Sequence, residues 1–100
     1  MKTLAAIPCF NEERAIGSVA LKTRKHVDDV LVVDDGSTDN TVKVATEAGA
    51  TVVSHEVNKG YGAAIRCCFN YAKEHDVDTM IILDGDGQHD PLTYLILSQQ

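Results

Sequence analysis

Four short apolar runs recur along the chain, and they define the strands that the sequence predicts. They are rich in valine and isoleucine and do not alternate strictly with polar residues. Strands that are buried on both faces of a parallel sheet have this pattern. The runs cover residues 3–7, 30–33, 51–54 and 79–83.

The segments between these runs carry apolar residues at helical spacing, which predicts helices. The expected helices lie near residues 16–27, 41–48 and 64–72, and a fourth follows residue 91. Asn11 would cap the first helix, and a residue within 37–39 would cap the second. The fourth would begin at Asp90 and Pro91, a capping residue followed by proline at the first helical position.

Strands that alternate with helices predict an α/β fold. Right-handed crossovers would produce a Rossmann-like, mainly parallel sheet with helices on both faces. In such sheets ligands bind outside the carboxyl ends of the strands, and the most polar loops of this chain follow those ends. Residues 1–100 suit one domain. The last nine residues, LTYLILSQQ, look like an interrupted helix, so we expect a truncated piece of a longer enzyme.

Charge and cysteine content narrow the classes of partner. Nine basic and fifteen acidic residues give a net charge of −6, and no basic patch could grip a nucleic acid. The three cysteines fit neither a disulfide framework nor a zinc motif, which favours reduced thiols in a cytoplasmic protein. No apolar run in the sequence reaches membrane-spanning length. An acidic protein binds an anionic ligand when a divalent cation or backbone N–H groups supply positive charge.

Asp84 and Asp86 follow the fourth predicted strand and form the main candidate metal site. In extended backbone, residues two apart point the same way, and two converging carboxylates repel each other unless a cation lies between them. Gln88 offers a third oxygen, and this ligand set suits Mg²⁺ or Mn²⁺. The alternative is a solvated acidic turn. An EF-hand is excluded, because His89 stands in place of its turn glycine and Leu95 in place of its final glutamate.

The loops after the first two strands supply further candidates. We expect Asp34 and Ser37 to serve turn and capping roles, whereas Asp35 could accept hydrogen bonds from a ribose hydroxyl or a base N–H. Glu12 could face the same crevice or simply favour a helix N-terminus, and nothing local decides between the two.

The segment NKGYGAA at residues 58–64 begins the third predicted helix and carries a weaker signal. Its glycines suit a phosphate at the helix N-terminus, but close packing of small residues explains them equally well. His26, His55 and His75 lie in flanking segments without the spacing of metal ligands, so we expect them at the surface. The sequence assigns no role to Cys9 or Tyr61.

Taken together and in this order, the segments IPCFNEE, VVDDGSTD, NKGYGAA and DGDGQHDP resemble family 2 glycosyltransferases with the GT-A fold. The nearest group is similar to the polyprenyl-phosphate (dolichyl-phosphate-type) sugar synthases. The resemblance covers nearly all of the chain. Each segment alone is a loose match to the family. The specificity of the resemblance comes from the presence of all four segments in the same order and at the ends of the predicted strands.

The resemblance implies a donor site for a UDP- or GDP-sugar. Asp84 and Asp86 would hold Mg²⁺ or Mn²⁺ on the diphosphate, with Gln88 beside them and Gly85 against the donor. The residues expected to hold the nucleoside are Pro8, Phe10, Glu12, Val33 and Asp35.

The implied reaction is an inverting transfer of a hexose to an acceptor such as polyprenyl phosphate, at the cytoplasmic face of a membrane in the full-length protein. The family resemblance places the catalytic base and the acceptor site beyond residue 100. This segment alone should therefore bind donor and metal far better than it turns substrate over, and its exposed apolar surface could favour self-association.

Three other classes compete with this interpretation. A haloacid-dehalogenase-type phosphatase places its Asp-x-Asp motif after the first strand and continues it with Thr or Val, whereas here the fourth strand precedes it and Gln88 and His89 follow. A phosphoreceiver domain needs paired acids where this chain has Pro8 and Cys9. A non-catalytic nucleotide-sugar-binding module remains open.

Overall fold

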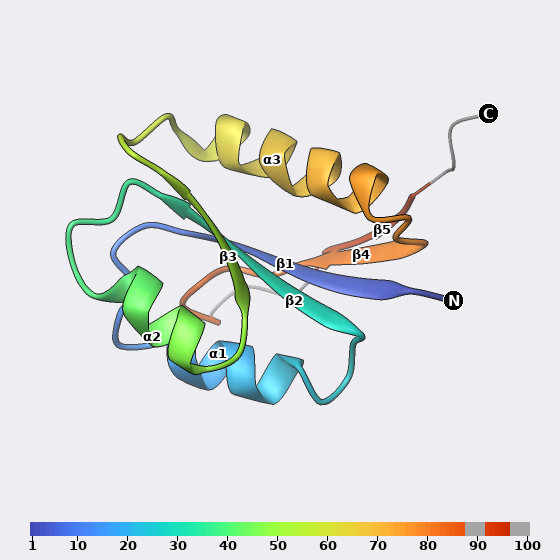
Figure 1. Ribbon diagram of the computed structural model, residues 1–100, viewed down its shortest axis with the longest axis horizontal. Helices are drawn as coiled ribbons and strands as arrows, with labels where there is room; N and C mark the ends of the chain where they lie inside the picture. The colour runs from blue at the N-terminus through green and yellow to red at the C-terminus, as the bar shows by residue number, and fades with distance from the viewer. Residues whose placement is uncertain (88–91, 97–100) are drawn as a thin grey trace.

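A computed structural model describes residues 1–87 and 92–96 of the chain (Figure 1). Strands and helices alternate until the last strand. The elements are β1 (Thr3–Cys9), α1 (Ile16–Thr23), β2 (Asp29–Asp35), α2 (Thr41–Glu47), β3 (Thr51–His55), α3 (Tyr61–Glu74), β4 (Thr79–Ile82) and β5 (Leu92–Leu95).

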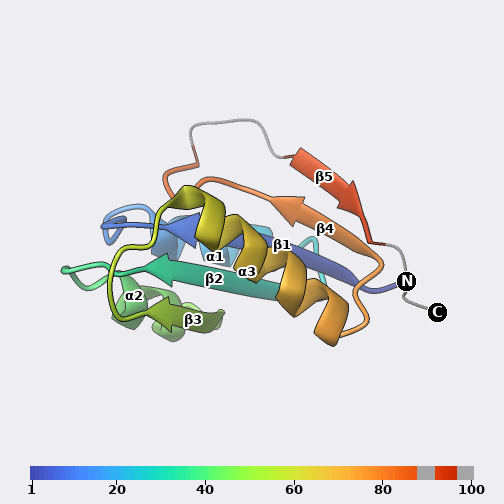
Figure 2. The same ribbon diagram turned by 90° about the horizontal axis from the view of Figure 1, so that it is seen from above.

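The five strands form one sheet in the order β3-β2-β1-β4-β5, with β1 in the centre (Figure 2). The pairs β1–β2, β1–β4 and β2–β3 are parallel, and β5 runs antiparallel to β4. The four predicted strands and the mainly parallel α/β sheet are thereby confirmed. Because β2 and β4 flank β1 in parallel, the carboxyl ends of three strands meet at one edge of the sheet.

Helices cover both faces of the sheet, as predicted. Helix α3 packs on one face, and α1 and α2 pack on the other (Figure 1). Strand β1 supplies both cores: Leu4 and Ala6 belong to the cluster under α3, and Ala5 and Ile7 to the cluster under α1 and α2. The burial of β1 on both faces thus explains why its residues are apolar at successive positions.

The fourth predicted helix is wrong, because Leu92–Leu95 forms strand β5. The outer edge of β4 offers unpaired backbone groups, and pairing with them outweighs the local helix signal. The Tyr94 ring also packs edge-on against Phe69 of α3, with centroids 5.0 Å apart. The expected cap at Asp90 and Pro91 lies outside the described residues.

Helix capping departs from the sequence prediction at both helices. The cap residue of α2 is Asn40, outside the predicted 37–39, and its side chain makes no capping hydrogen bond. Asp39, one residue earlier, accepts a hydrogen bond from Thr41 N at 2.9 Å through Oδ1. Asn11 does not cap α1, which begins after Ala15. Asn11 instead adopts a left-handed φ of 52° and accepts a hydrogen bond from Thr38 N at 2.9 Å. Within the described part of the chain, no helix is long and apolar enough to cross a membrane.

Candidate functional site

A hollow of about 250 Å³ lies at the edge where β1, β2 and β4 end. It is lined by Pro8, Cys9, Phe10, Glu12, Asp35, Tyr61, Asp84, Gly85 and Asp86. These residues come from the last positions of β1 and β2, from the loops after β1 and β4, and from the first residue of α3. Their meeting point is the crevice at which sheets of this type bind ligands.

Seven of the nine residues predicted for the donor site line this hollow. Val33 does not: its side chain is fully buried in the core beneath α3. Gln88 lies outside the described residues. Cys9 and Tyr61 line the hollow although they were given no role. Cys9 could have been found from its place between Pro8 and Phe10 at a strand end, and Tyr61 from its place at the start of a helix.

Asp84 and Asp86 both line the hollow, but the backbone there is not extended as we expected. A turn closes the segment, in which Gly87 N donates a hydrogen bond to Asp84 O at 3.0 Å. Gly87 adopts a left-handed φ of 71°, which glycine tolerates without strain. The turn, rather than strand alternation, therefore brings the two carboxylates to the same hollow.

The Glu12 side chain faces this hollow, which decides between the two interpretations of Glu12. Its backbone N–H donates to Thr41 Oγ1 at 2.9 Å, and its carbonyl accepts from Ala15 N and Ile16 N just before α1. The pKa of Glu12 is raised, first by partial burial and then by the negative charges of Asp86, Asp39 and Asp84. Negative charge therefore accumulates in the hollow, which favours a cation there.

The donor set suits a hard divalent cation that is shared with a ligand. Among the described residues, no three His, Cys, Asp or Glu side chains come together as a ready-made metal site. Asp84 and Asp86 line the same hollow, and Mg²⁺ is commonly held by one or two carboxylates together with water and substrate phosphates. Asp84 and Asp86 therefore fit a Mg²⁺ or Mn²⁺ ion that also contacts a phosphate.

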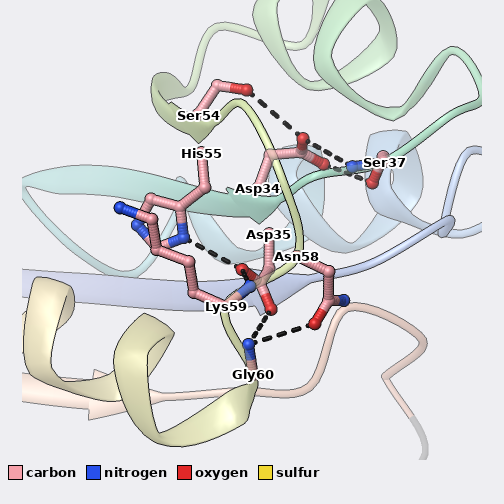
Figure 3. A network of polar contacts seen from close by, with 8 residues as sticks. All are labelled: Asp34, Asp35, Ser37, Ser54, His55, Asn58, Lys59 and Gly60. Atoms are coloured by element: carbon pink, nitrogen blue, oxygen red, sulfur yellow. Dashed lines mark hydrogen bonds and ion pairs between the residues drawn. The ribbon is translucent and has the colours of Figure 1, made fainter.

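At the other end of the hollow, Asp35 is held by three hydrogen bonds (Figure 3). Its carboxylate accepts from Lys59 N at 2.8 Å and Gly60 N at 2.9 Å, and His55 Nδ1 lies 2.9 Å from Oδ1. Burial by itself would raise the pKa of Asp35, but these hydrogen bonds outweigh it and lower the pKa. Asp35 is therefore an anion with a fixed orientation.

This network revises two expectations. His55 was expected at the surface, yet only 13% of its side chain is exposed, because the ring packs beside Asp35. The N–H groups of Lys59 and Gly60 at the start of α3 were candidates for a phosphate, but here they donate to a carboxylate of the chain itself.

Asp34 has the structural role that the sequence predicted. Its side chain is buried and points away from Asp35, toward Ser37 and Ser54 (Figure 3). It accepts from Ser37 N at 3.1 Å and from Ser37 Oγ, and more weakly from Ser54 Oγ at 3.4 Å. Gly36, which completes this turn, has a φ of 78°, and a Cβ there would lie 2.5 Å from Asn58 N. Only glycine fits this crossing of two loops.

Cys9 lines the hollow, and its thiol is unreactive. Burial, then the charges of Asp34 and Glu12, raise the pKa of Cys9 far above its ordinary value. Its Sγ lies 3.5 Å from the Ile7 carbonyl, to which it donates. A thiol that stays protonated neither attacks a substrate nor binds a metal, so Cys9 serves packing.

Known proteins match this chain in both sequence and fold. The sequence model of Glycosyl transferase family 2 matches residues 5–97. A UDP-N-acetylglucosamine–dolichyl-phosphate N-acetylglucosaminyltransferase of Methanococcus voltae is 34% identical over 103 residues, covering 85% of this chain and 41% of that protein. An undecaprenyl-phosphate mannosyltransferase of Micrococcus luteus is 32% identical over 98 residues, covering 91% and 40%.

Among solved structures, glucosyl-3-phosphoglycerate synthase of Mycobacterium tuberculosis, in complex with Mn²⁺, UDP-glucose and phosphoglyceric acid, matches with a TM-score of 0.74. It is 30% identical, and the match covers 84% of this chain and 33% of that one. This likeness confirms the expected GT-A type of fold. The chain spans less than half the length of each of these three proteins. The match across residues 5–97 shows that the chain belongs to glycosyl transferase family 2.

Proposed function

We propose that residues 1–100 form the donor-binding half of a metal-dependent, inverting glycosyltransferase. The enzyme would transfer a hexose from a UDP- or GDP-sugar to an acceptor such as polyprenyl phosphate. One observation carries this proposal: a single hollow gathers Asp35, held as an anion, with Asp84 and Asp86 across the end of the central strand.

The comparisons support the substrate class. The solved neighbour binds UDP-glucose together with Mn²⁺. The relatives from Methanococcus voltae and Micrococcus luteus are named for transfer to dolichyl phosphate and undecaprenyl phosphate. An acceptor of that kind lies in a membrane, and we propose that the reaction takes place at its cytoplasmic face.

The metal end of the site would be formed by Asp84 and Asp86, with Gln88 beside them. Their carboxylates orient the donor by fixing where its diphosphate can lie. Mg²⁺ or Mn²⁺, when bound there, would neutralise the diphosphate and stabilise it as a leaving group. Glu12 adds negative charge to the same hollow, which strengthens the preference for a cation.

The nucleoside end would be formed by Asp35 together with Pro8, Phe10 and Glu12. Asp35 is an acceptor only, so it would bind a base N–H or a ribose hydroxyl. Phe10 is 46% exposed and offers an apolar surface to the ligand. Val33 has no exposed surface and would act only by supporting the strand end beneath the hollow.

The chemical step would require groups that follow residue 100. An acceptor oxygen attacks the anomeric carbon as the bond to the diphosphate breaks, and a general base within hydrogen-bonding reach removes the proton. Attack from the side opposite the leaving group inverts the configuration. Residues 1–100 would hold and orient the donor while the rest of the enzyme supplies base and acceptor.

Calorimetry with UDP and with GDP, each with and without Mn²⁺, tests the proposal. We expect one of the two nucleotides to bind saturably only when Mn²⁺ is present, and Asp86→Ala to abolish that binding. Glu47→Ala, which removes an exposed carboxylate at the end of α2, is the matched control and should bind as the unchanged protein does. No binding of either nucleotide, or release of phosphate from a simple monoester, would contradict the proposal.

A further inference from the structure

We infer that His55 is a positioning residue of the donor site, which orients the Asp35 carboxylate toward the nucleoside. The inference rests on the proposed function, because it assigns to His55 a part in binding the nucleoside end of the donor. His55 does not line the hollow itself and would act entirely through Asp35.

The sheet register brings the two side chains together. Asp35 is the last residue of β2 and His55 the last residue of β3, and the two are direct partners across the parallel pair. Direct partners on neighbouring strands project from the same face of a sheet. The His55 ring accordingly lies beside Asp35, with Nδ1 2.9 Å from Oδ1 and with 13% and 7% of the two side chains exposed.

The hydrogen bonds of Asp35 show what His55 contributes. Oδ1 accepts from His55 Nδ1 and Lys59 N, and Oδ2 accepts from Gly60 N. A carboxylate has about four acceptor positions, so groups of the described chain occupy three and leave one on Oδ2. Two of the three donors are backbone N–H groups of one loop. Among the described residues, His55 is the only side chain that donates to Asp35, and it holds Oδ1 from the neighbouring strand β3.

The chemistry of the pair determines which ring nitrogen of His55 must carry a hydrogen. A carboxylate only accepts hydrogen bonds, so Nδ1 must carry the hydrogen. The neutral ring with hydrogen on Nδ1 and the fully protonated ring both meet this need. If His55 is replaced by an apolar residue, Oδ1 loses a donor inside a mostly buried site. The carboxylate can then turn, and its remaining acceptor position no longer points in one direction.

The hollow has two ends, and this separates a positioning role from a general structural role. Asp35 is the last residue of β2, whereas Asp84 and Asp86 follow β4 on the far side of β1. A positioning role predicts weaker binding at the Asp35 end alone. A general loss of structure predicts weaker binding at both ends.

The test is a titration followed by two-dimensional amide NMR, which measures weak affinities and reports on folding at the same time. Uridine and guanosine probe the Asp35 end, and pyrophosphate with the diamagnetic ion Mg²⁺ probes the Asp84 and Asp86 end. We expect His55→Leu to weaken nucleoside binding about 5- to 10-fold, which corresponds to the usual net contribution of one hydrogen bond. Binding of pyrophosphate with Mg²⁺ should stay within about twofold, because no contact there changes.

Two substitutions at the same position sharpen the test. His55→Asn places an amide N–H the same number of bonds from Cα as Nδ1, so it should restore nucleoside affinity to within about threefold. His55→Gln places its N–H one bond farther out and should bind nucleoside as weakly as His55→Leu. Should His55→Leu fail to fold, His55→Gln takes its place. His75→Leu, at an exposed histidine of another segment, should change nothing.

The possible outcomes separate this inference from the proposed function. Nucleoside binding by His55→Leu at full strength overturns the inference, as does an equal loss of nucleoside and pyrophosphate binding. A failure of His55→Asn to recover affinity also overturns it. If the unchanged chain binds neither UDP nor GDP with Mn²⁺, the proposed function itself fails, and the inference fails with it.

Discussion

Gly85 lies directly against the Cys9 thiol. A Cβ on Gly85 would stand 2.8 Å from Cys9 Sγ and 3.1 Å from Glu12 Cγ. The thiol is buried and donates a hydrogen bond to the Ile7 carbonyl, so it has little room to move. The absence of a side chain at residue 85 is therefore what lets the acidic turn after β4 pack on the end of β1.

Gly85→Ala should lower the free energy of unfolding by about 1–3 kcal/mol, the usual cost of overpacking a buried contact. It should also weaken binding of UDP or GDP with Mn²⁺, because the turn that carries Asp84 and Asp86 is displaced. Urea denaturation and calorimetry measure the two effects. Gly62→Ala is the matched control: its Cβ would lie an acceptable 3.5 Å from Arg66 within α3, and alanine favours helix.

Cys9→Ala removes the sulfur atom with which the methyl group added by Gly85→Ala would clash. In the double variant the added methyl group has space, so the two substitutions should cost less together than the sum of their separate costs. A double-mutant cycle measures this difference. Additive costs would show that the contact between Cys9 and Gly85 does not limit the turn.

Asp86→Asn should lower the pKa of Glu12 toward its ordinary value. Partial burial raises that pKa first, and Asp86 is the largest of the neighbouring charges that add to it. Carbon-13 NMR of the Glu12 carboxyl during a pH titration measures the change. Asp29→Asn, at an exposed position before the core of β2, should leave Glu12 unchanged. An unaltered pKa in Asp86→Asn would mean that the two carboxylates do not share the hollow.

Asp35→Asn should lower the free energy of unfolding near pH 7 by about 1–3 kcal/mol, because an amide cannot satisfy the donors that Asp35 accepts from. The pKa of Asp35 is lowered in the folded protein. Its stabilising contribution is therefore complete above the unfolded pKa of about 3.9 and is lost as the pH falls through the lower folded value. Urea denaturation from pH 7 to pH 2.5 should show the two proteins converging at the acid end. A constant difference across that range would contradict the assigned sign.

Phe69→Leu and Tyr94→Leu should be coupled in a double-mutant cycle by about 0.5–1.5 kcal/mol, the usual strength of an edge-to-face ring pair. The two rings meet at 79° because β5 returns along β4 beneath α3. Urea denaturation of the two single variants and the double variant gives the coupling. Absence of coupling would favour the helix that the local sequence predicts for this segment.

The sequence predicted the features that depend on local pattern. The apolar runs located β1 to β4 because strands that are buried on both faces are apolar at successive positions, which makes them stand out in the sequence. Asp35, Asp84 and Asp86 were found because polar residues after buried strands must gather at one edge of a parallel sheet.

The features that the sequence did not predict depend on contacts between distant residues. Asp90 and Pro91 carry an ordinary helix signal, and only the open edge of β4 makes the following residues a strand. His55 is unremarkable in sequence, and its role depends on the register that pairs it with Asp35. Asn11 has the composition of a cap, but its bond to Thr38 belongs to a loop 27 residues away.

Strand β1 ends in Pro8 and Cys9, whereas Asp35 is the last residue of β2 and Asp84 follows β4. This uncharged tip acts as a spacer that keeps Asp35 and the Asp84 turn two strand widths apart, roughly 9.5 Å at the usual spacing. A lone phosphate or a lone base is too short to touch both ends. Under the proposed function, the spacing of the sheet would favour a donor that carries both a base and a phosphate chain, because such a ligand is long enough to contact both ends.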